Sequence, residues 1–375
     1  MTVIDGARYI PTPTIDRDRL GSALRRGSRL HQRLRSLPHG PIGRHGVAAG
    51  DLAATIVAAV DIGATSVHLL VAAWTDDGLI PLADDSVVLG LGRTVDATGE
   101  LGPAKRAELV AALERHARMA RRLGAESIAF VGTEPLRRAS DALRAIDEVQ
   151  RATGIRIEAL DHETEGFLTL LGVTRGRPHG RDLAVVDVGG GSSELVVARA
   201  GEPPEAVGLP IGAARLTQAV GPGNPPSWAD LVGMRAVARE CLTGAPRLGG
   251  LELLAVGGTA SNLLKLSSGG DAAGRLARGD LERIIGRLVG RSSGLVARRF
   301  GVTRSRARLL PAGATILTAL LDQVGLEALR VSHAGIREGL ATALVHHGPD
   351  WRDGLPVAPD PVPGVAAAGS REDGS

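Results

Sequence analysis

The sequence predicts an α/β protein made of two similar domains that face a central cleft. Three observations carry this prediction. The segment Val185–Val197 consists of an apolar strand that ends at Asp187, a run of three glycines and a second apolar strand. The segment Val60–Ala72 repeats it in register, with Val, Asp, Gly, Ser, Leu, Val and Ala recurring. Strand-like and helix-like stretches alternate after each copy, so the repeat has the size of a domain.

The two glycine turns are candidate anion sites. Glycine has no Cβ, so backbone N–H groups in such a turn can close on an anion. Asp187, at the end of its strand, is placed to act on that anion directly or through a cation. A single turn of this kind would also fit an ordinary glycine-rich hairpin. Two facing turns, one in each half, resemble the plan of the actin-like ATPase (ribonuclease H-like) and sugar-kinase superfamily.

Strands and helices are predicted from apolar periodicity, and Asp76-Asp77-Gly78 predicts a hairpin turn. In the first half we expect strands over Thr55–Val60, Val67–Trp74, Ile80–Leu89, Ser127–Val131 and Ile155–Leu160. We expect a loop over Gly90–Arg93, an amphipathic helix over Pro103–Leu123 and further helices from Pro135 and over Thr164–Val173. The second half predicts helix Ala229–Leu242, strands Leu251–Val256 and Leu329–Ser332, and a final helix Gly335–His346.

The composition changes at both ends of this pattern. Residues 1–50 are rich in Pro, Gly, His and Arg and predict a disordered basic extension, and residues 348–375 predict a disordered tail. Arg175–Asp182 is polar and contains Gly and Pro, as a linker does. We therefore expect domain I over residues 51–176 and domain II over residues 177–347.

The composition fits a soluble, cytoplasmic protein. The chain has 375 residues, enough for two sizeable domains. No apolar run reaches the roughly 18 residues of a membrane helix, because the best candidate, Leu52–Ala73, contains Asp61. Met1–Asp5 lacks the order of a signal peptide. Cys241 is the only cysteine, which excludes an internal disulfide and suits a reducing cytoplasm.

Charge is distributed unevenly. The chain carries +3, but residues 1–50 contain nine Arg and three Asp, a balance of +6, which leaves −3 for the rest. We therefore expect no need for nucleic acid and no membrane partner, although arginines gathered in one cleft could bind a polyanion. The basic extension could tether nucleic acid, acidic lipid or polyphosphate, but a solvated tail is the simpler interpretation.

Seven short motifs follow one another along the chain. They are Asp61-Ile62-Gly63, Gly132-Thr133 with Leu136-Arg137, Glu165 with Leu171-Gly172-Val173, Asp187–Glu194, Pro210-Ile211-Gly212, Gly257-Gly258-Thr259 and Ile336–Gly339. Each alone is weak. Together, in this order, they resemble the exopolyphosphatase/guanosine pentaphosphate phosphatase (Ppx/GppA) family, in its short two-domain form.

The resemblance implies removal of the terminal phosphoryl group of inorganic polyphosphate, or of guanosine pentaphosphate (pppGpp), by attack of water assisted by Mg²⁺ or another divalent cation. It implies Glu165 as the catalytic carboxylate, and Asp187 and Glu194 as acids around the metal ion and the attacking water. It implies phosphate contacts from Gly63, Thr65, Ser66, Arg137, Gly189, Gly190, Gly191, Ser192 and Arg337. A homodimer is left open.

These residue types suit the chemistry. A phosphoanhydride end carries several negative charges, which N–H turns, two arginines and a divalent cation can neutralise. The water then needs a base, and a carboxylate is the simplest one available. The alternatives are a helix-start role for Glu165, stabilised by the helix dipole, and surface ion pairs for Arg137 and Arg337.

Other interpretations stay open. His162 and Glu163 are adjacent on a turn, which is poor geometry for a shared metal ion, so neither is expected to be a ligand. His68 is expected to be a packed core or cleft histidine. Ala64 and Thr164 depart from the family's usual residues, which leaves open a non-catalytic binder of polyphosphate or alarmone. A kinase of the same superfamily is the remaining alternative, although no acceptor-binding signature is found.

Overall fold

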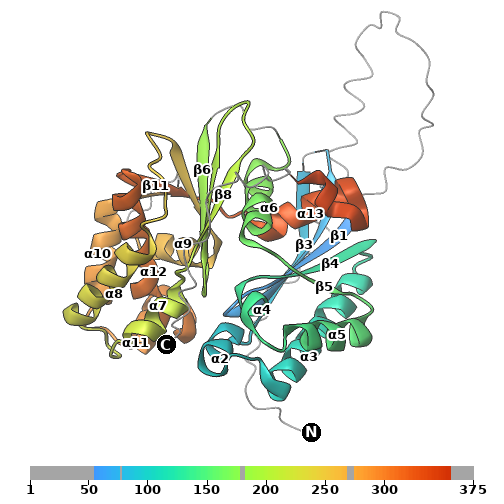
Figure 1. The fold of residues 1–375 in the computed structure, drawn as a ribbon, viewed down its shortest axis with the longest axis horizontal. Coiled ribbons are helices and arrows are strands. Elements are labelled where there is room, and N and C mark those ends of the chain that lie inside the picture. Colours follow the sequence, from blue (N-terminus) through green and yellow to red (C-terminus); the bar gives the residue numbers. More distant parts are fainter. Residues whose placement is uncertain (1–54, 77, 178–181, 268–273, 356–375) are drawn as a thin grey trace, which may run out of the picture.

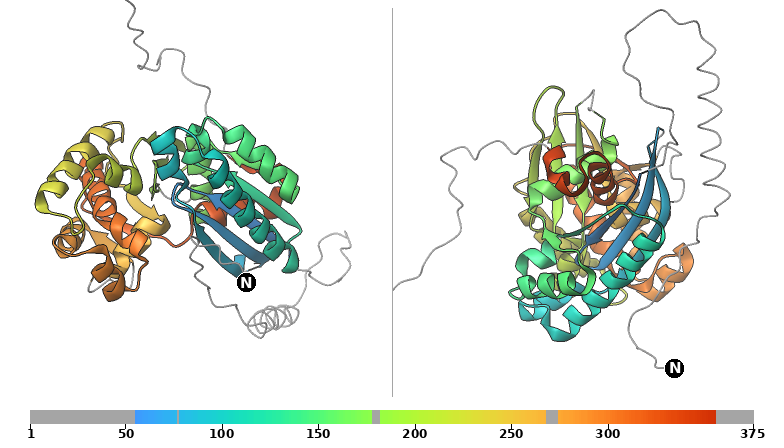
Figure 2. Two further views of the ribbon diagram at one scale, coloured as in Figure 1. Left: turned by 90° about the horizontal axis from the view of Figure 1, so that it is seen from below. Right: turned by 90° about the vertical axis from the view of Figure 1, so that its right-hand side faces the viewer.

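The computed structural model describes residues 55–76, 78–177, 182–267 and 274–355. The predicted basic extension and the end of the predicted tail lie outside these residues. The described chain forms two lobes, each built on one β-sheet (Figures 1 and 2). Among the described residues, no helix combines the length and the apolar character needed to cross a membrane.

The two sheets share one topology. The first has the order β3-β2-β1-β4-β5, with β1 (Ile56–Ile62), β2 (Ser66–Thr75), β3 (Gly78–Val88), β4 (Ser127–Gly132) and β5 (Ile157–Ala159). The second has the order β10-β11-β9-β6-β7-β8, with β6 (Leu183–Val188), β7 (Ser193–Ala198), β8 (Glu205–Leu209), β9 (Glu252–Val256), β10 (Arg275–Ala277) and β11 (Ala328–Val331). In each sheet a three-stranded antiparallel meander continues into two parallel strands. The shared topology confirms the predicted duplication.

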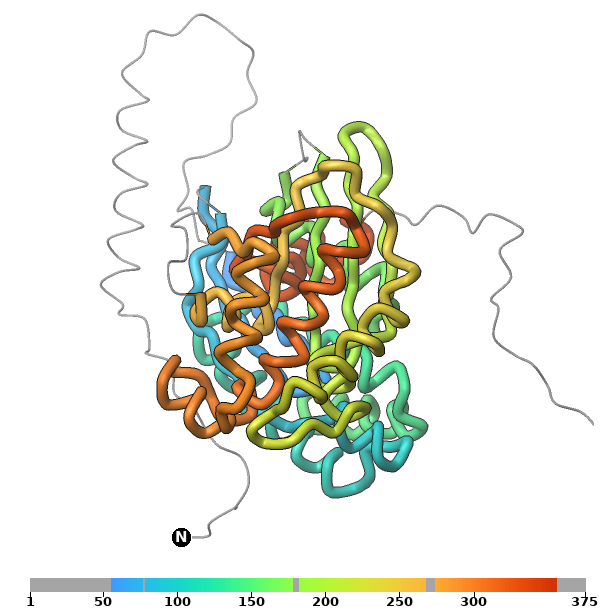
Figure 3. The backbone as a smooth tube through the Cα atoms, turned by 90° about the vertical axis from the view of Figure 1, so that its left-hand side faces the viewer, coloured from blue at the N-terminus to red at the C-terminus, as the bar shows by residue number. Residues whose placement is uncertain are grey.

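Helices cover both sheets. Those of the first half are α2 (Leu91–Thr98), α3 (Gly102–Arg122), α4 (Glu134–Arg138), α5 (Ala142–Thr153) and α6 (His162–Thr174). Those of the second half are α7 (Ala213–Val220), α8 (Trp228–Cys241), α9 (Gly257–Leu266), α10 (Arg278–Leu288), α11 (Ser293–Phe300), α12 (Arg304–Val324) and α13 (Ile336–His347). The short helix η1 (Gly348–Gly354) follows. Helices α8, α10 and α12 lie on the outer side of the second lobe (Figures 1 and 3).

The last helix of each half packs on the sheet of the other half. Helix α6 follows β5 of the first sheet but lies on β6, β7 and β8, where Phe167 packs with Val196. Helix α13 follows β11 of the second sheet but lies on β1 and β2, where Leu340 packs with Val57. The predicted boundary placed the final helix with domain II, whereas its apolar face completes the core of the first lobe.

The two crossing helices approach each other closely. A Cβ on Gly172 of α6 would lie 2.1 Å from the carbonyl oxygen of Gly335. A Cβ on Gly339 of α13 would lie 1.7 Å from the carbonyl oxygen of Leu168. Only glycine permits this backbone approach, which joins the lobes on the side opposite α2 and α7 (Figure 1).

Two predictions about short segments were wrong. Gly90–Arg93, predicted as a loop, contains the start of α2. The predicted disordered tail begins too early, because η1 buries Trp351 to 1% exposure, and its Nε1 donates to Glu158 at 3.1 Å. In α2 the buried residues Leu91 and Val95 lie one helical turn apart, a period too short to stand out in the sequence, whereas in η1 the burial of Trp351 depends on tertiary contacts.

Candidate active site

The two glycine turns have the same internal geometry. The N–H of Gly63 donates to the carbonyl of Ser66 at 3.1 Å, and the N–H of Gly189 donates to the carbonyl of Ser192 at 3.0 Å. Each turn connects the first strand of its sheet to the second. The repeat seen in the sequence is therefore also a repeat of backbone conformation.

Each turn is anchored by hydrogen bonds from N–H groups at the start of a helix to the carbonyl groups of the turn. In the first turn the carbonyl of Ala64 accepts the N–H of Gly92, at the start of α2, at 2.9 Å. In the second, the carbonyl of Gly190 accepts the N–H of Ala214, at the start of α7, also at 2.9 Å. Because these carbonyl groups point toward the helices, the N–H groups on the other side of each turn are available to an anion in the cleft.

A cavity of about 680 Å³ lies between the lobes and is lined by both turns. The two turns nearly touch, because a Cβ on Gly190 would lie 2.7 Å from Oγ1 of Thr65. The predicted site residues that line this cavity are Gly63, Thr65, Ser66, Glu165, Asp187, Gly189, Gly190, Gly191, Ser192 and Arg337. The structure thus gathers them in one place.

Glu165 lies in the first turn of α6, which begins after the N-cap Asp161. Its carboxylate accepts a hydrogen bond from Nη1 of Arg137 at 2.7 Å, and the same nitrogen donates to the carbonyl of Leu160 at 2.8 Å. Burial, followed by the nearby charge of Glu194, raises the pKa of Glu165 well above its usual range, while Arg137 opposes the rise. Such a carboxylate is a suitable base near neutral pH.

Glu194 and Arg137 stand behind Glu165. The hydroxyl of Ser192 donates to Oε1 of Glu194 at 2.8 Å, and Arg137 Nη2 lies 3.6 Å from the same oxygen. Burial raises the pKa of Glu194 to about 8, although the bond from Ser192 opposes the rise. Arg137 therefore serves two acids that come from different halves of the chain.

Asp61 and Asp187 end the equivalent strands β1 and β6. Burial and then the charge of Asp187 raise the pKa of Asp61 to about 7, and burial raises the pKa of Asp187 to about 6. Oδ1 of Asp61 is buried and has no partner among the described residues. A Cβ on Gly257 would lie 2.5 Å from Oδ1 of Asp187, so glycine keeps the space beside this carboxylate open. Two such carboxylates are suitable ligands for a hard divalent cation.

His162 lies closer to this chemistry than expected. Its Nδ1 lies 2.9 Å from Oε1 of Glu194, and the two residues could form a metal-binding group with Glu165, with one ligand atom each within 4.8 Å of the others. Glu163 is exposed and takes no part. Sequence adjacency was the wrong test for His162, because its neighbour in space comes from β7. Nη2 of Arg137 lies 3.2 Å from Nδ1 of His162, so a positive charge is already present in this group without a metal ion.

Basic side chains also line the cavity and form a basic wall. Arg337 donates to Asp84 at 2.7 Å, and Arg306 and Lys265 also face the cavity. Burial, followed by the charge of Arg337, lowers the pKa of Arg306. His68 is neutral, because burial and these two arginines lower its pKa to about 3. A wall of cations that repel one another is suited to a polyanion.

Several residues at the cavity were not predicted from the sequence. Asp61 is the equivalent of Asp187 in the repeat, so the alignment of the two copies could have found it. Glu134 and Arg306 carry no such signal, because their proximity depends on how the two lobes meet.

A sequence profile of the "Ppx/GppA phosphatase family" matches residues 70–347. The chain belongs to the Ppx/GppA family. The match covers both lobes and the residues of the cavity from Glu134 to Glu338, so the predicted family is confirmed and the chain is a member of a family of phosphatases.

Similar proteins and solved structures agree with this assignment. Exopolyphosphatase 1 of Mycobacterium tuberculosis is 28% identical over 299 residues, which cover 75% of this chain and 86% of that protein. An uncharacterised protein of Streptomyces coelicolor is 31% identical over 325 residues, which cover 81% of this chain and 96% of that protein.

The crystal structure of the Ppx/GppA family member of Aquifex aeolicus has a TM-score of 0.67 at 26% identity and covers 78% of this chain and 98% of that one. An exopolyphosphatase structure from Cytophaga hutchinsonii has a TM-score of 0.69 at 21% identity, covering 78% of this chain and 98% of its own. Together with the shared sheet topology, the likeness confirms the predicted α/β fold with two duplicated domains.

Proposed function

We propose that this protein is a hydrolase that releases orthophosphate from the ends of inorganic polyphosphate. The observation that supports this most is the place of Glu165. It is a buried carboxylate with a raised pKa, and it lines a cavity that also contains two glycine turns and several cations. The resemblance to a mycobacterial protein named exopolyphosphatase supports polyphosphate as the substrate.

The terminal phosphoryl group would lie in the cavity, against both turns. Their N–H groups, with the hydroxyl of Thr65, would bind its oxygens. The hydroxyl of Ser192 already donates to Glu194, so Ser192 would contribute its backbone N–H. Arg337 and Arg306, on the basic wall, would take the phosphates that follow in the chain. Arg137 is already held by Glu165 and Glu194, so its role is to orient these acids as much as to face the substrate.

The residues present fit a divalent cation. Asp187 with Asp61 is the better pair of ligands, because one oxygen of Asp61 lacks a partner and Glu194 is already hydrogen-bonded by Ser192. Bound there, Mg²⁺ would offset the charge of the phosphoryl oxygens and make phosphorus more electrophilic.

Glu165 would perform the proton transfer. Its carboxylate would accept a proton from a water molecule beside the terminal phosphorus as the new P–O bond forms. The bridging P–O bond then breaks, orthophosphate is released and the shortened chain keeps the bridging oxygen. Arg137 fixes the carboxylate through the 2.7 Å bond to Glu165, so the base is oriented before substrate arrives.

The alternatives are hydrolysis of pppGpp and binding without catalysis. The described residues that line the cavity include no Phe, Tyr or Trp, and their only aromatic rings are the small imidazoles of His68 and His333. The absence of a large aromatic ring for guanine among them favours a substrate without a base. Phosphate release should be measured side by side with polyphosphate, pppGpp and ATP, each with Mg²⁺. We expect polyphosphate to be the best substrate. Faster release from pppGpp would contradict that choice, and no release from any substrate would favour the non-catalytic alternative.

A further inference from the structure

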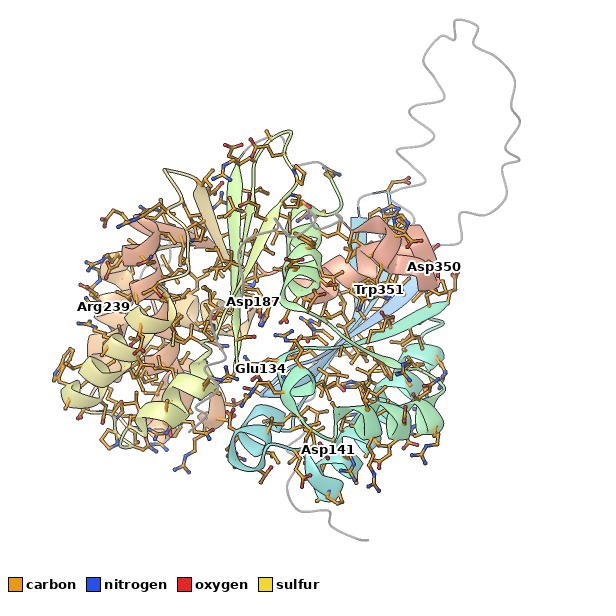
Figure 4. All side chains as sticks on the ribbon, in the orientation of Figure 1. Glu134, Asp141, Asp187, Arg239, Asp350 and Trp351 are labelled. Atoms are coloured by element: carbon orange, nitrogen blue, oxygen red, sulfur yellow. The ribbon has the colours of Figure 1, made fainter. Side chains whose placement is uncertain are left out.

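A second carboxylate, Glu134, lies at the junction of the two lobes. It is the first residue of α4, and Figure 4 shows it close to the junction where Asp187 also lies. Its side chain is 5% exposed and lines the cavity. No part of the proposed reaction uses it.

Glu134 forms an ion pair across the cleft. Its Oε1 accepts hydrogen bonds from Arg138, one turn later on α4, and from Arg215 of α7 in the second lobe. Arg138 also donates to Asp96 at 2.6 Å. Arg215 has no other ion pair among the described residues, so Glu134 supplies its counter-charge.

The other oxygen of Glu134 stands over the second glycine turn. A Cβ on Gly191 would lie 2.2 Å from Oε2, so only the missing side chain of glycine makes room for it. Oε2 is buried and has no partner among the described residues. A buried carboxylate oxygen without a donor is costly, yet this one lies beside a turn whose N–H groups suit an anion.

We propose that Glu134 is a resident anion at the second phosphate turn. Its carboxylate holds Arg215 in the empty cleft, and an incoming phosphoryl group displaces it and takes Arg215 as a ligand. The inference rests on the proposed function for its choice of ligand, a short polyphosphate. Glu134 then determines specificity. Phosphate anions with enough negative charge displace its carboxylate and bind at the turn, whereas anions with less charge bind weakly.

The displacement also links binding to the position of the lobes. The Glu134–Arg215 pair joins α4 to α7 on the side of the cleft opposite the crossing helices α6 and α13. When a phosphoryl group replaces the carboxylate, Arg215 keeps an anionic partner, so the lobes stay joined through the ligand.

The test is binding of tripolyphosphate with Mg²⁺ by calorimetry, in a Glu165→Gln background that prevents turnover. Glu134→Gln should tighten binding by about tenfold, because a negative charge next to the anion is removed and Arg215 is released. The gain should disappear when Arg215→Gln is added. Circular dichroism melts of each variant establish that it is folded.

Asp96→Asn is the matched control. It removes a negative charge that also contacts Arg138, but it leaves Glu134 and Arg215 together, so affinity should stay within about twofold. Unchanged or weaker binding by folded Glu134→Gln would overturn the inference, and weaker binding would identify Glu134 as a cation ligand instead. If neither the native chain nor any variant binds tripolyphosphate, the proposed function fails as well.

Discussion

Two buried glutamates and two half-buried aspartates determine the chemistry available at the residue scale. Asp61, Asp187, Glu165 and Glu194 come from four different elements, and burial raises the pKa of each. Acids this close repel one another, so they stay together only because Arg137 and, when bound, a cation balance them. Their contacts differ. Arg137 donates a hydrogen bond to Glu165, whereas in the proposed function the two aspartates bind the metal ion.

Glu165→Gln should lower kcat by about 10²–10⁴, the range for loss of a general base. The amide keeps the shape of the side chain and removes its basicity. Steady-state phosphate release measures the rate, and polyphosphate affinity should stay equal or tighten, because a negative charge near the anion is gone. Glu163→Gln, two residues away and exposed, should change kcat by less than about tenfold. Equal harm from both substitutions would show that the assignment of the base is wrong.

The raised carboxylate pKa values predict how stability depends on pH. The pKa of Asp61 is about 7 in the fold against an ordinary 3.8, so between these values the folded chain binds more protons than the unfolded one. Its contribution to stability is therefore complete below about pH 4 and is lost as pH rises through about 7. With a chelator present, the unfolding temperature of the native chain should fall between pH 5 and pH 8, and it should fall less in Asp61→Asn. Without chelator, added Mg²⁺ should raise the unfolding temperature of the native chain more at pH 8 than at pH 5. An equal slope in both chains would contradict this.

The sequence could predict the residues that belong to motifs, but not their partners. Glu165, Asp187 and the glycine turns carry signals in their own neighbourhood, and all line the cavity. The bond between His162 and Glu194 spans 32 residues and depends on α6 lying across the second sheet. No local pattern encodes that contact.

At the scale of elements, the crossing of α6 and α13 is the contact that unites the lobes. Strong periodicity made elements such as α3 predictable almost to the residue, with Pro103–Leu123 expected and Gly102–Arg122 found. Periodicity reports that a helix has an apolar face but not which sheet covers it. The exchange of the two last helices was therefore beyond prediction from the sequence.

Gly339→Ala should destabilise the protein by about 1–3 kcal/mol, as overpacking does, because the new Cβ would meet the carbonyl of Leu168 at the helix crossing. Denaturant unfolding measures the change. Gly286→Ala in α10 is the control: its Cβ would meet nothing within 4 Å, so it should stabilise by up to about 1 kcal/mol through helix propensity alone. If Gly339→Ala left the free energy of unfolding unchanged, the two helices could move apart at the crossing without loss of stability.

Trp351→Ala should cost about 3–5 kcal/mol, the usual loss for a large buried aromatic residue. Trp351 completes the apolar cluster beneath α13, so η1 belongs to the first lobe (Figure 4). Accordingly, a chain truncated to residues 51–355 should unfold at the native temperature, whereas one that ends at residue 347 should unfold earlier. Equal melting of the two truncated chains would show that the Trp351 contact contributes nothing.

The whole molecule is two copies of one domain whose equivalent turns meet. The duplication could be seen in the sequence because Val60–Ala72 and Val186–Ala198 align without gaps. The closeness of the lobes could not, since it results from side-chain contacts such as Glu134 with Arg215. The two turns lie close together, because a Cβ on Gly190 would lie 2.7 Å from Oγ1 of Thr65, and both line one cavity of about 680 Å³.

Polyphosphate should therefore be shortened from its ends. A chain middle would have to pass between the two turns, where a Cβ on Gly190 already lies 2.7 Å from Thr65, whereas a chain end needs only to reach them. The cavity contains one base oriented by Arg137, so each cycle removes one terminal phosphate. Gel analysis should show orthophosphate accumulating while long chains persist. Polyphosphate with both ends blocked by a bulky amine should resist release, although it presents the same chain middles. An early mixture of mid-length fragments, or equal rates on blocked and free chains, would mean that the substrate is cleaved internally.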